Sequence, residues 1–239
     1  MRIGLTYDLR AEHPAQAGAP PDHDLEFSSA GEIDQLAAIL TGLGHNVRPI
    51  GHLQNLVSFL DDGERGDLVF NYAAGVLGRG REAQIPALLD AYRLPYTFSD
   101  SLTLALCLDK GLTKLVWEKH GLTTAAFAVV RDLAALGSGT TPLPPFPLFV
   151  KPAYEGSSKG ITSESIVESE APLRQRVAYL LETYRQPVLV EGYLPGREFT
   201  VGILGGGEQA RVMGMVEIRS TSPGGVNSFA DKEEWDRRI

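Results

Sequence analysis

FVKPAYEGSSKGI, residues 149–161, is the stretch that decides the fold of this chain. The apolar residues Phe146 and Leu148–Val150 lead into it and predict a short buried strand that ends in Lys151. The loop Gly156–Gly160 follows, with two glycines and two serines. A cation on a strand, next to a loop rich in backbone N–H and hydroxyl donors, suits a polyphosphate. Taken alone, the same pattern equally fits a surface hairpin whose Gly-Ser turn only reverses the chain.

Composition and charge limit the possible functions. The chain has 239 residues, of which 43% are hydrophobic and 22% charged, so it is an ordinary globular sequence of one large domain or two to three small ones. Its formal net charge of -8 argues against a nucleic-acid-binding surface, because no basic excess offsets phosphate repulsion. A polyanion must therefore bind locally, through a few placed lysines and a bound cation.

The single cysteine and the absence of long apolar segments point to the cytoplasm. Cys107 excludes an internal disulfide and a multi-thiolate metal site, and its apolar surroundings predict a small core residue. The amino terminus lacks a basic region followed by an apolar stretch, and no apolar run approaches the length of a membrane span. We expect a soluble cytoplasmic protein without membrane contact.

Strand and helix patterns alternate over the first part of the chain. Strands are expected at 1–6, 47–50, 67–70 and 96–97, helices at 30–43, 53–60 and 83–92, and a Pro/Gly-rich loop at 11–24. This alternation predicts a small parallel α/β domain that ends near Ser101.

The remainder predicts an α+β unit. One long helix is expected at 102–120 and an amphipathic helix at 170–184, with strands at 126–130, 166–167, 187–190, 197–204 and 209–218. A proline-rich connection covers 137–147, a turn 223–226, and the opening of a further helix or strand 232–239.

Further candidate binding residues lie outside the first stretch. Lys110 lies on the long helix, the connector Glu191–Glu198 has a carboxylate at each end, and Lys232 lies near the end of the chain. Each also has an ordinary interpretation: a lysine whose stem snorkels, a polar hairpin, and a surface charge. The last group of candidates lies in the loop after the third expected strand and consists of Arg79, Arg81, Glu82 and Gln84. α/β domains place ligand contacts in such loops, although arginines in loops are more often solvated.

The order of these motifs resembles the ATP-grasp superfamily, and within it the D-alanine–D-alanine ligases. The resemblance is carried by LPYT at 94–97 with LDK at 108–110, by VKPA at 150–153 with GSSKGI at 156–161, and by VE at 190–191 with GREFTV at 196–201. It implies a small parallel-sheet N-terminal domain at 1–101, a first ATP-grasp lobe at 102–185, and a truncated second lobe at 186–239. Several spaced motifs in the right order are more specific than any one of them.

The resemblance also implies roles for individual residues. Lys110, Lys151 and Lys232 would bind the ATP phosphates, and the loop with Gly156, Ser157 and Ser158 would close over them. Glu191, Tyr193 and Leu194 would hold adenine, and Glu198 the ribose. Lys151, Ser157 and Lys232 would be the catalytic residues. In this family a carboxylate attacks the γ-phosphate and an amine then displaces phosphate from the acyl phosphate to form an amide, which depends on positioning and charge neutralisation.

Three departures from the family pattern concern the metal and the substrate. The family binds Mg²⁺, but its ligands would follow the Lys232 segment, beyond residue 239, and no metal ligand is assigned here. Tyr7-Asp8-Leu9-Arg10 replaces an early glycine-rich loop, which leaves Glu26 as a candidate contact to an amino group. The segment 75–82, GVLGRGRE, replaces another family signature.

The leading interpretation is an ATP-dependent carboxylate–amine ligase for a small amino acid or peptide. As it stands, this chain should be weak or inactive, because the metal-binding segment is missing. The alternatives are a nucleotide-binding remnant without ligase activity and a ligase for a different amino acid or peptide. A homodimer is possible.

Overall fold

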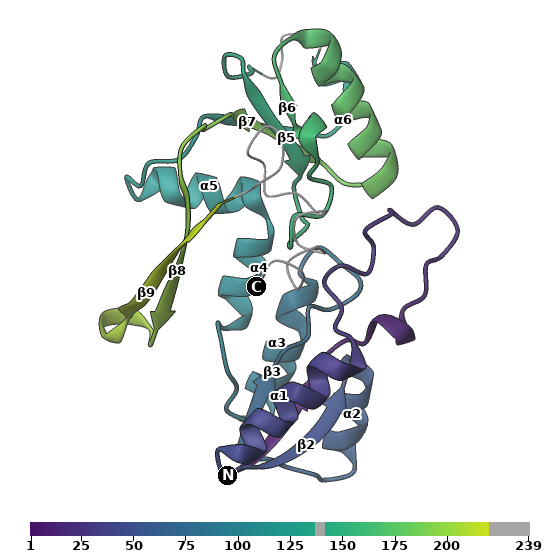
Figure 1. Ribbon diagram of the computed structural model, residues 1–239, viewed down its shortest axis with the longest axis vertical. Helices are drawn as coiled ribbons and strands as arrows, with labels where there is room; N and C mark the ends of the chain where they lie inside the picture. The colour runs from purple at the N-terminus through teal and green to yellow at the C-terminus, as the bar shows by residue number, and fades with distance from the viewer. Residues whose placement is uncertain (137–141, 220–239) are drawn as a thin grey trace. The chain divides into compact units, whose positions relative to one another are not determined.

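The computed structural model describes residues 1–136 and 142–219, and it divides into two compact units (Figure 1). Unit 1 consists of Met1–Thr123 and Ala153–Ser157, and unit 2 of Thr124–Pro152 and the chain from Ser158 onward. The chain therefore passes from unit 1 to unit 2 within the Gly-Ser loop, between Ser157 and Ser158. The expected division at 101 and 185 remains a prediction.

Unit 1 is built on a three-stranded parallel sheet in which β1 lies between β2 and β3. The strands are β1 (Arg2–Thr6), β2 (Asn46–Gly51) and β3 (Leu68–Asn71), and the helices that follow them are α1 (Ala30–Gly42), α2 (Leu53–Asp61) and α3 (Gln84–Ala91). Leu56 and Leu89, from α2 and α3, are completely buried and pack with Val69 of β3. The expected small parallel α/β domain is confirmed.

The ends of α1 illustrate how the sequence sets an element. The Ser29 hydroxyl accepts a hydrogen bond from the Glu32 N–H at 3.2 Å, and the Glu32 carboxylate accepts one from the Ser29 N–H at 2.6 Å. This capping box satisfies two N–H groups that the first helical turn would leave unpaired. Gly44, just past the other end, has a φ of +86°, which glycine adopts at little cost.

The prediction of one long helix at 102–120 was wrong, because the chain forms two helices that are separated at Asp109. The structure has α4 (Ser101–Leu108) and α5 (Lys110–Lys119), and Asp109 between them has extended backbone with ψ of 95°. Its carboxylate accepts a hydrogen bond from the Leu112 N–H at 3.0 Å and so begins a second helix. Lys110 is consequently the first residue of α5.

Two smaller predictions for unit 1 were also wrong. Residues 96–97 form no strand; Tyr96 makes only an isolated bridge to Val69, a buried residue of β3. Cys107 is exposed instead of buried, because α4 packs through other positions, among them the buried Leu108.

Unit 2 contains a four-stranded antiparallel sheet in the order β4-β7-β5-β6, covered by one helix. The elements are β4 (Phe127–Val130), β5 (Leu148–Pro152), β6 (Ile166–Val167), α6 (Glu170–Tyr184) and β7 (Val188–Gly192). Leu173, Val177 and Leu180 of α6 form one core with Val150 and Val190 of the sheet. The α6 limits are those expected from its amphipathic pattern.

The remaining strands of unit 2 form a two-stranded antiparallel hairpin, β8 (Glu198–Leu204) and β9 (Arg211–Ile218). Arg197 at its base donates two hydrogen bonds to Glu217, at 2.8 and 3.0 Å. The structure also has short 3₁₀ turns at Arg10–Glu12, Arg81–Ala83, Leu133–Leu136, Ser163–Ser165 and Gly207–Gln209. The elements expected at 223–226 and 232–239, and part of the proline-rich connection, lie outside the described residues. Across the described residues, no helix has the length and apolarity that a membrane span requires.

Candidate functional site

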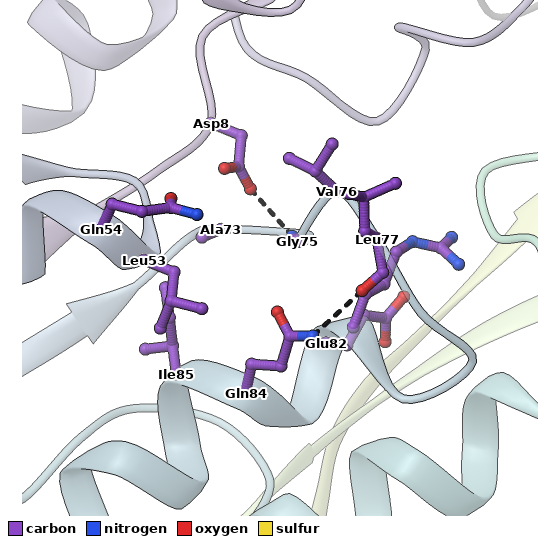
Figure 2. Close-up of a pocket in the computed structure, with 11 residues that line it drawn as sticks. Asp8, Leu53, Gln54, Ala73, Gly75, Val76, Leu77, Glu82, Gln84 and Ile85 are labelled. Atoms are coloured by element: carbon purple, nitrogen blue, oxygen red, sulfur yellow. Dashed lines mark hydrogen bonds between the residues drawn. The ribbon is translucent and has the colours of Figure 1, made fainter. Parts of the chain in front are cut away.

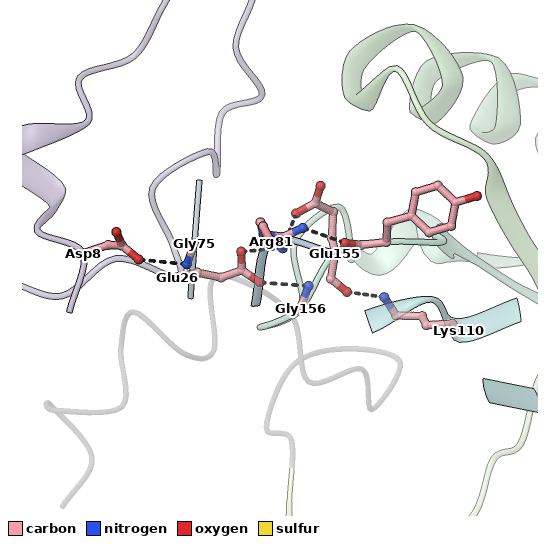
Figure 3. A network of polar contacts seen from close by, with 8 residues as sticks. Asp8, Glu26, Gly75, Arg81, Lys110, Glu155 and Gly156 are labelled. Atoms are coloured by element: carbon pink, nitrogen blue, oxygen red, sulfur yellow. Dashed lines mark hydrogen bonds and ion pairs between the residues drawn. The ribbon is translucent and has the colours of Figure 1, made fainter. Parts of the chain in front are cut away.

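The residues that lead into the Gly-Ser loop are attached to unit 1 through α5. The Lys110 N–H donates to the Ala153 carbonyl at 3.1 Å, and the Lys110 ammonium group donates to the Glu155 carbonyl (Figure 3). The break in the helix at Asp109 makes this possible, because it places Lys110 at the start of α5. Lys110, Gly156 and Ser157 thus belong to one compact unit.

Arg81 is the centre of the polar network in unit 1. Its side chain is only 7% exposed, and it donates to the Glu26 carboxylate at 2.8 Å and to the Tyr154 carbonyl at 2.9 Å. A third contact reaches the Glu155 carboxylate at 3.3 Å. Burial disfavours the charged guanidinium, but the two carboxylates outweigh that effect and raise the pKa of Arg81. Arg81 is therefore a permanent buried cation. Most arginines in loops are exposed to water, but the side chain of Arg81 is not.

Glu26 connects this network to the loop and to a cavity. One of its oxygens accepts from Arg81, and the other accepts from the Gly156 N–H at 2.9 Å (Figure 3). Glu26, Gly156 and Ser157 line a cavity of about 470 Å³ that Glu82 also lines. Burial raises the pKa of Glu82 above the ordinary carboxyl value, against the opposing effect of Arg81.

A second, smaller cavity of about 220 Å³ lies in unit 1 where the parallel strands end (Figure 2). Asp8 follows β1, Gln54 follows β2, and Gly75 follows β3, and all three line it. The Asp8 carboxylate accepts from the Gly75 N–H at 2.8 Å, which fixes the two loops to each other (Figure 2). Open α/β sheets bind ligands at this edge. Glu82 lines both cavities.

In unit 2, Lys151 lies on the sheet face opposite α6. Its ammonium group pairs with the Glu191 carboxylate at 2.6 Å, across the paired strands β5 and β7. The rings of Phe149 and Tyr193 stack beside this pair with centroids 6.3 Å apart, and Lys151 lies 5.4 Å from the Phe149 ring centroid. The structure thus gathers a lysine, a carboxylate and two aromatic rings on one face, a set of groups suited to a phosphate and a base.

The second half of the loop is attached to unit 2. Gly160, with φ of +70°, lies so close to Pro152 that a Cβ atom would be 2.5 Å from the proline Cγ. The Arg176 side chain, 4% exposed, donates to the Gly160 carbonyl at 2.6 Å and to the Ser165 hydroxyl at 3.3 Å. Ser157 and Ser158 have positive φ values of 47° and 63°. Such values are uncommon for residues other than glycine, and they cluster at functional sites.

The remaining candidates Leu194, Glu198 and Lys232 are exposed or lie outside the described residues. Leu194 is 71% exposed, and Glu198 is an exposed residue at the start of β8. Lys232 lies outside the described residues. Lys110 belongs to unit 1 and Lys151 to unit 2. Over residues 1–136 and 142–219, no group of three His, Cys, Asp or Glu side chains is arranged to hold a metal ion.

Sequence reasoning gave too little weight to the arginines and to Glu26. Arg81 was named only as a loop residue, and Arg176 was not singled out within the helix expected at 170–184, yet both are buried. Glu26 lies 130 residues before Gly156, and no local pattern connects residues so far apart. Arg79 also has defined partners, since it pairs with Asp109 and lies 4.7 Å from the Tyr154 ring centroid.

Comparison with known proteins identifies the family. The family model described as the D-ala D-ala ligase C-terminus matches residues 116–236, about half of the chain. An uncharacterized protein, y4sG, of Sinorhizobium fredii is 36% identical over 63% of this chain and 43% of its own length. A D-alanine–D-alanine ligase of Bordetella pertussis is 36% identical over 64% of this chain and 46% of its own length. The chain thus spans less than half the length of these curated relatives.

A solved structure supports the same fold. The D-alanine–D-alanine ligase of Bacillus anthracis complexed with ATP matches 99% of this chain and 75% of its own chain, with a TM-score of 0.59 and 19% sequence identity. This agreement in fold, together with the family match, confirms the architecture expected from the spaced motifs. The chain belongs to the D-alanine–D-alanine ligase family of the ATP-grasp superfamily.

Proposed function

We propose that this chain carries the nucleotide site of an ATP-dependent carboxylate–amine ligase. The observation that carries the proposal is the polar face of the unit 2 sheet, where Lys151 pairs with Glu191 beside two stacked rings. Both residues lie within the segment that the family model matches. The relative with ATP bound supports the choice of nucleotide.

The proposed roles follow the chemistry of each group. Lys110 and Lys151 bind phosphate oxygens, because an ammonium group makes short, charge-assisted hydrogen bonds to them. Gly156, Ser157 and Ser158 add backbone N–H and hydroxyl donors. Glu191 and the chain through Tyr193 and Leu194 hold adenine, and Glu198 accepts from the ribose hydroxyls. Lys232 is a further proposed phosphate ligand.

The proposed reaction transfers the γ-phosphoryl group to a carboxylate, and an amine then displaces phosphate. Positioning and charge neutralisation carry such a transfer, so Lys151, Ser157 and Lys232 need not act as nucleophiles. The family implies Mg²⁺, but no three His, Cys, Asp or Glu side chains among the described residues are arranged to hold it.

The proposed substrates are small amino acids or peptides. The cavity of about 470 Å³ in unit 1 is large enough for such a molecule, and it adjoins Gly156 and Ser157 of the loop. The relative from Bordetella pertussis is named for D-alanine. The segment 75–82 departs from the family pattern, so the acid and the amine must be found by a screen.

The test is release of ADP from ATP, Mg²⁺ and a panel of D- and L-amino acids and dipeptides, with the 239-residue chain and with any longer form of it. We expect amino-acid-dependent ADP release, weak from the 239-residue chain and stronger from a longer form. Nucleotide binding without release in any combination would instead support a nucleotide-binding protein without ligase activity. The absence of both binding and release would refute the proposal.

A further inference from the structure

We propose that two buried arginines, Arg81 and Arg176, are positioning residues that fix the two ends of the Gly156–Gly160 loop, each within its own unit. The proposal deepens the proposed function, since it rests on this loop being the one that holds the nucleotide phosphates. Neither arginine is assigned contact with the nucleotide.

Arg81 fixes the first end through two different nitrogens. Its Nη1 donates to the Tyr154 carbonyl at 2.9 Å, and its Nη2 donates to the Glu26 carboxylate at 2.8 Å. Glu26 links Arg81 to the loop, because its other carboxylate oxygen accepts a hydrogen bond from the Gly156 N–H at 2.9 Å. The approach is so close that a Cβ atom on Gly156 would lie 2.5 Å from the Glu26 oxygen. The backbone from 154 to 156 is thus held by a buried, charge-assisted network.

Arg176 fixes the second end in a similar way. Its Nη2 donates to the Gly160 carbonyl at 2.6 Å and to the Ser165 hydroxyl at 3.3 Å. The Ser165 hydroxyl in turn accepts from the Thr162 N–H at 3.1 Å. One guanidinium therefore orders the backbone from 160 to 162.

The residues between the two ends carry the unusual backbone. Ser157 and Ser158 both have positive φ, and such conformations persist only where the surroundings impose them. Gly156, held through Arg81 and Glu26, directly precedes Ser157 in unit 1, and Gly160, held by Arg176, lies two residues after Ser158 in unit 2. Each arginine thereby orders the backbone next to one of these serines, and with it the direction of the N–H and hydroxyl groups that phosphate binding needs.

Lysine substitutions test this inference without removing the buried charge. A lysine has one ammonium nitrogen, which cannot replace the two nitrogens with which Arg81 donates. At position 176 the lysine side chain ends one bond short of the Nη2 atom that makes both contacts. The variants are Arg81→Lys and Arg176→Lys. Matched controls come from the same units: Arg48→Lys, where the side chain is 61% exposed, and Arg174→Lys, where it is 39% exposed.

The readout is exchange of individual backbone amides, measured by NMR without nucleotide. Arg81→Lys should speed exchange at Gly156 by about tenfold and leave Ile161 and Thr162 unchanged, because one charge-assisted contact is lost locally. Arg176→Lys should do the reverse. A variant that leaves its own end unchanged, or that speeds exchange at both ends together, overturns the proposal, since general destabilisation would give the second result.

Nucleotide affinity separates this inference from the proposed function. In calorimetric titrations with ATP and Mg²⁺, both lysine variants should bind more weakly than the wild type and both controls equally well. Failure of the wild type to bind ATP would contradict the proposed function, while the amide exchange would still decide whether the arginines fix the loop. Full affinity in variants with altered exchange would refute their positioning role.

Discussion

Lys151 and Glu191 form a partly buried ion pair, with side chains 21% and 12% exposed. In the proposed site, the Lys151 ammonium group donates hydrogen bonds both to the Glu191 carboxylate and to a phosphate oxygen. We expect Lys151→Met to weaken ATP binding by about 1.5–3 kcal/mol, or about 10- to 150-fold, which is the range for a hydrogen bond to a charged group. Calorimetric titration measures this loss. Lys119→Met, at an exposed position on α5, is the control and should leave the affinity unchanged.

Glu82 gives a pH-dependent prediction at the same scale. Burial raises its folded-state pKa above the usual 4.5, so the folded protein binds this proton more tightly than the unfolded chain. Ionised Glu82 therefore destabilises the fold above its raised pKa, and the cost disappears below the unfolded value. Glu82→Gln should stabilise the protein at pH 7, and this gain should shrink toward zero near pH 4.

Urea denaturation at both pH values measures the difference between Glu82→Gln and the wild type. The control is Glu118→Gln, because Glu118 is an exposed residue of α5. Glu32→Gln is not a suitable control, because Glu32 caps α1. A gain for Glu82→Gln that is the same at both pH values would show that burial of the charge is not its cause.

At the scale of elements, the junction between the loop and the following residues depends on Gly160. Alanine there would need a positive φ, and its Cβ would lie 2.5 Å from Pro152 and 3.1 Å from the Tyr184 ring. We expect Gly160→Ala to lower the free energy of unfolding by about 2–4 kcal/mol, from strain and overpacking together. Gly196→Ala, with no atom within 4 Å of its Cβ position, should change it by less than about 0.5 kcal/mol.

Most elements could be predicted from the sequence because their patterns are local. The α6 limits followed from apolar spacing, and α1 followed from apolar spacing and Gly44. The prediction of one long helix at 102–120 failed because the apolar pattern continues through Asp109, whereas the Asp109 carboxylate caps a second helix. Periodicity measures which face is apolar and does not detect a cap inside a continuous pattern.

At the scale of the whole molecule, the family could be predicted from motif order, and the polar network could not. Lys110, Lys151 and the Gly-Ser loop stand out because strand, helix and loop patterns surround them. Arg81 does not, since its partners Glu26 and Glu155 lie 55 and 74 residues away, and only folding brings them together. The roles of the site residues remain proposals.

The central claim is that Lys110 and Lys151 each bind phosphate oxygens of ATP. The most direct measurement compares calorimetric affinities for ATP with Mg²⁺ and for adenosine in the wild type, Lys110→Met and Lys151→Met. We predict that each substitution lowers the affinity for ATP by about tenfold or more and leaves the affinity for adenosine unchanged. If either variant binds ATP as tightly as the wild type, or loses ATP and adenosine affinity equally, that lysine does not bind the phosphates and the claim is contradicted.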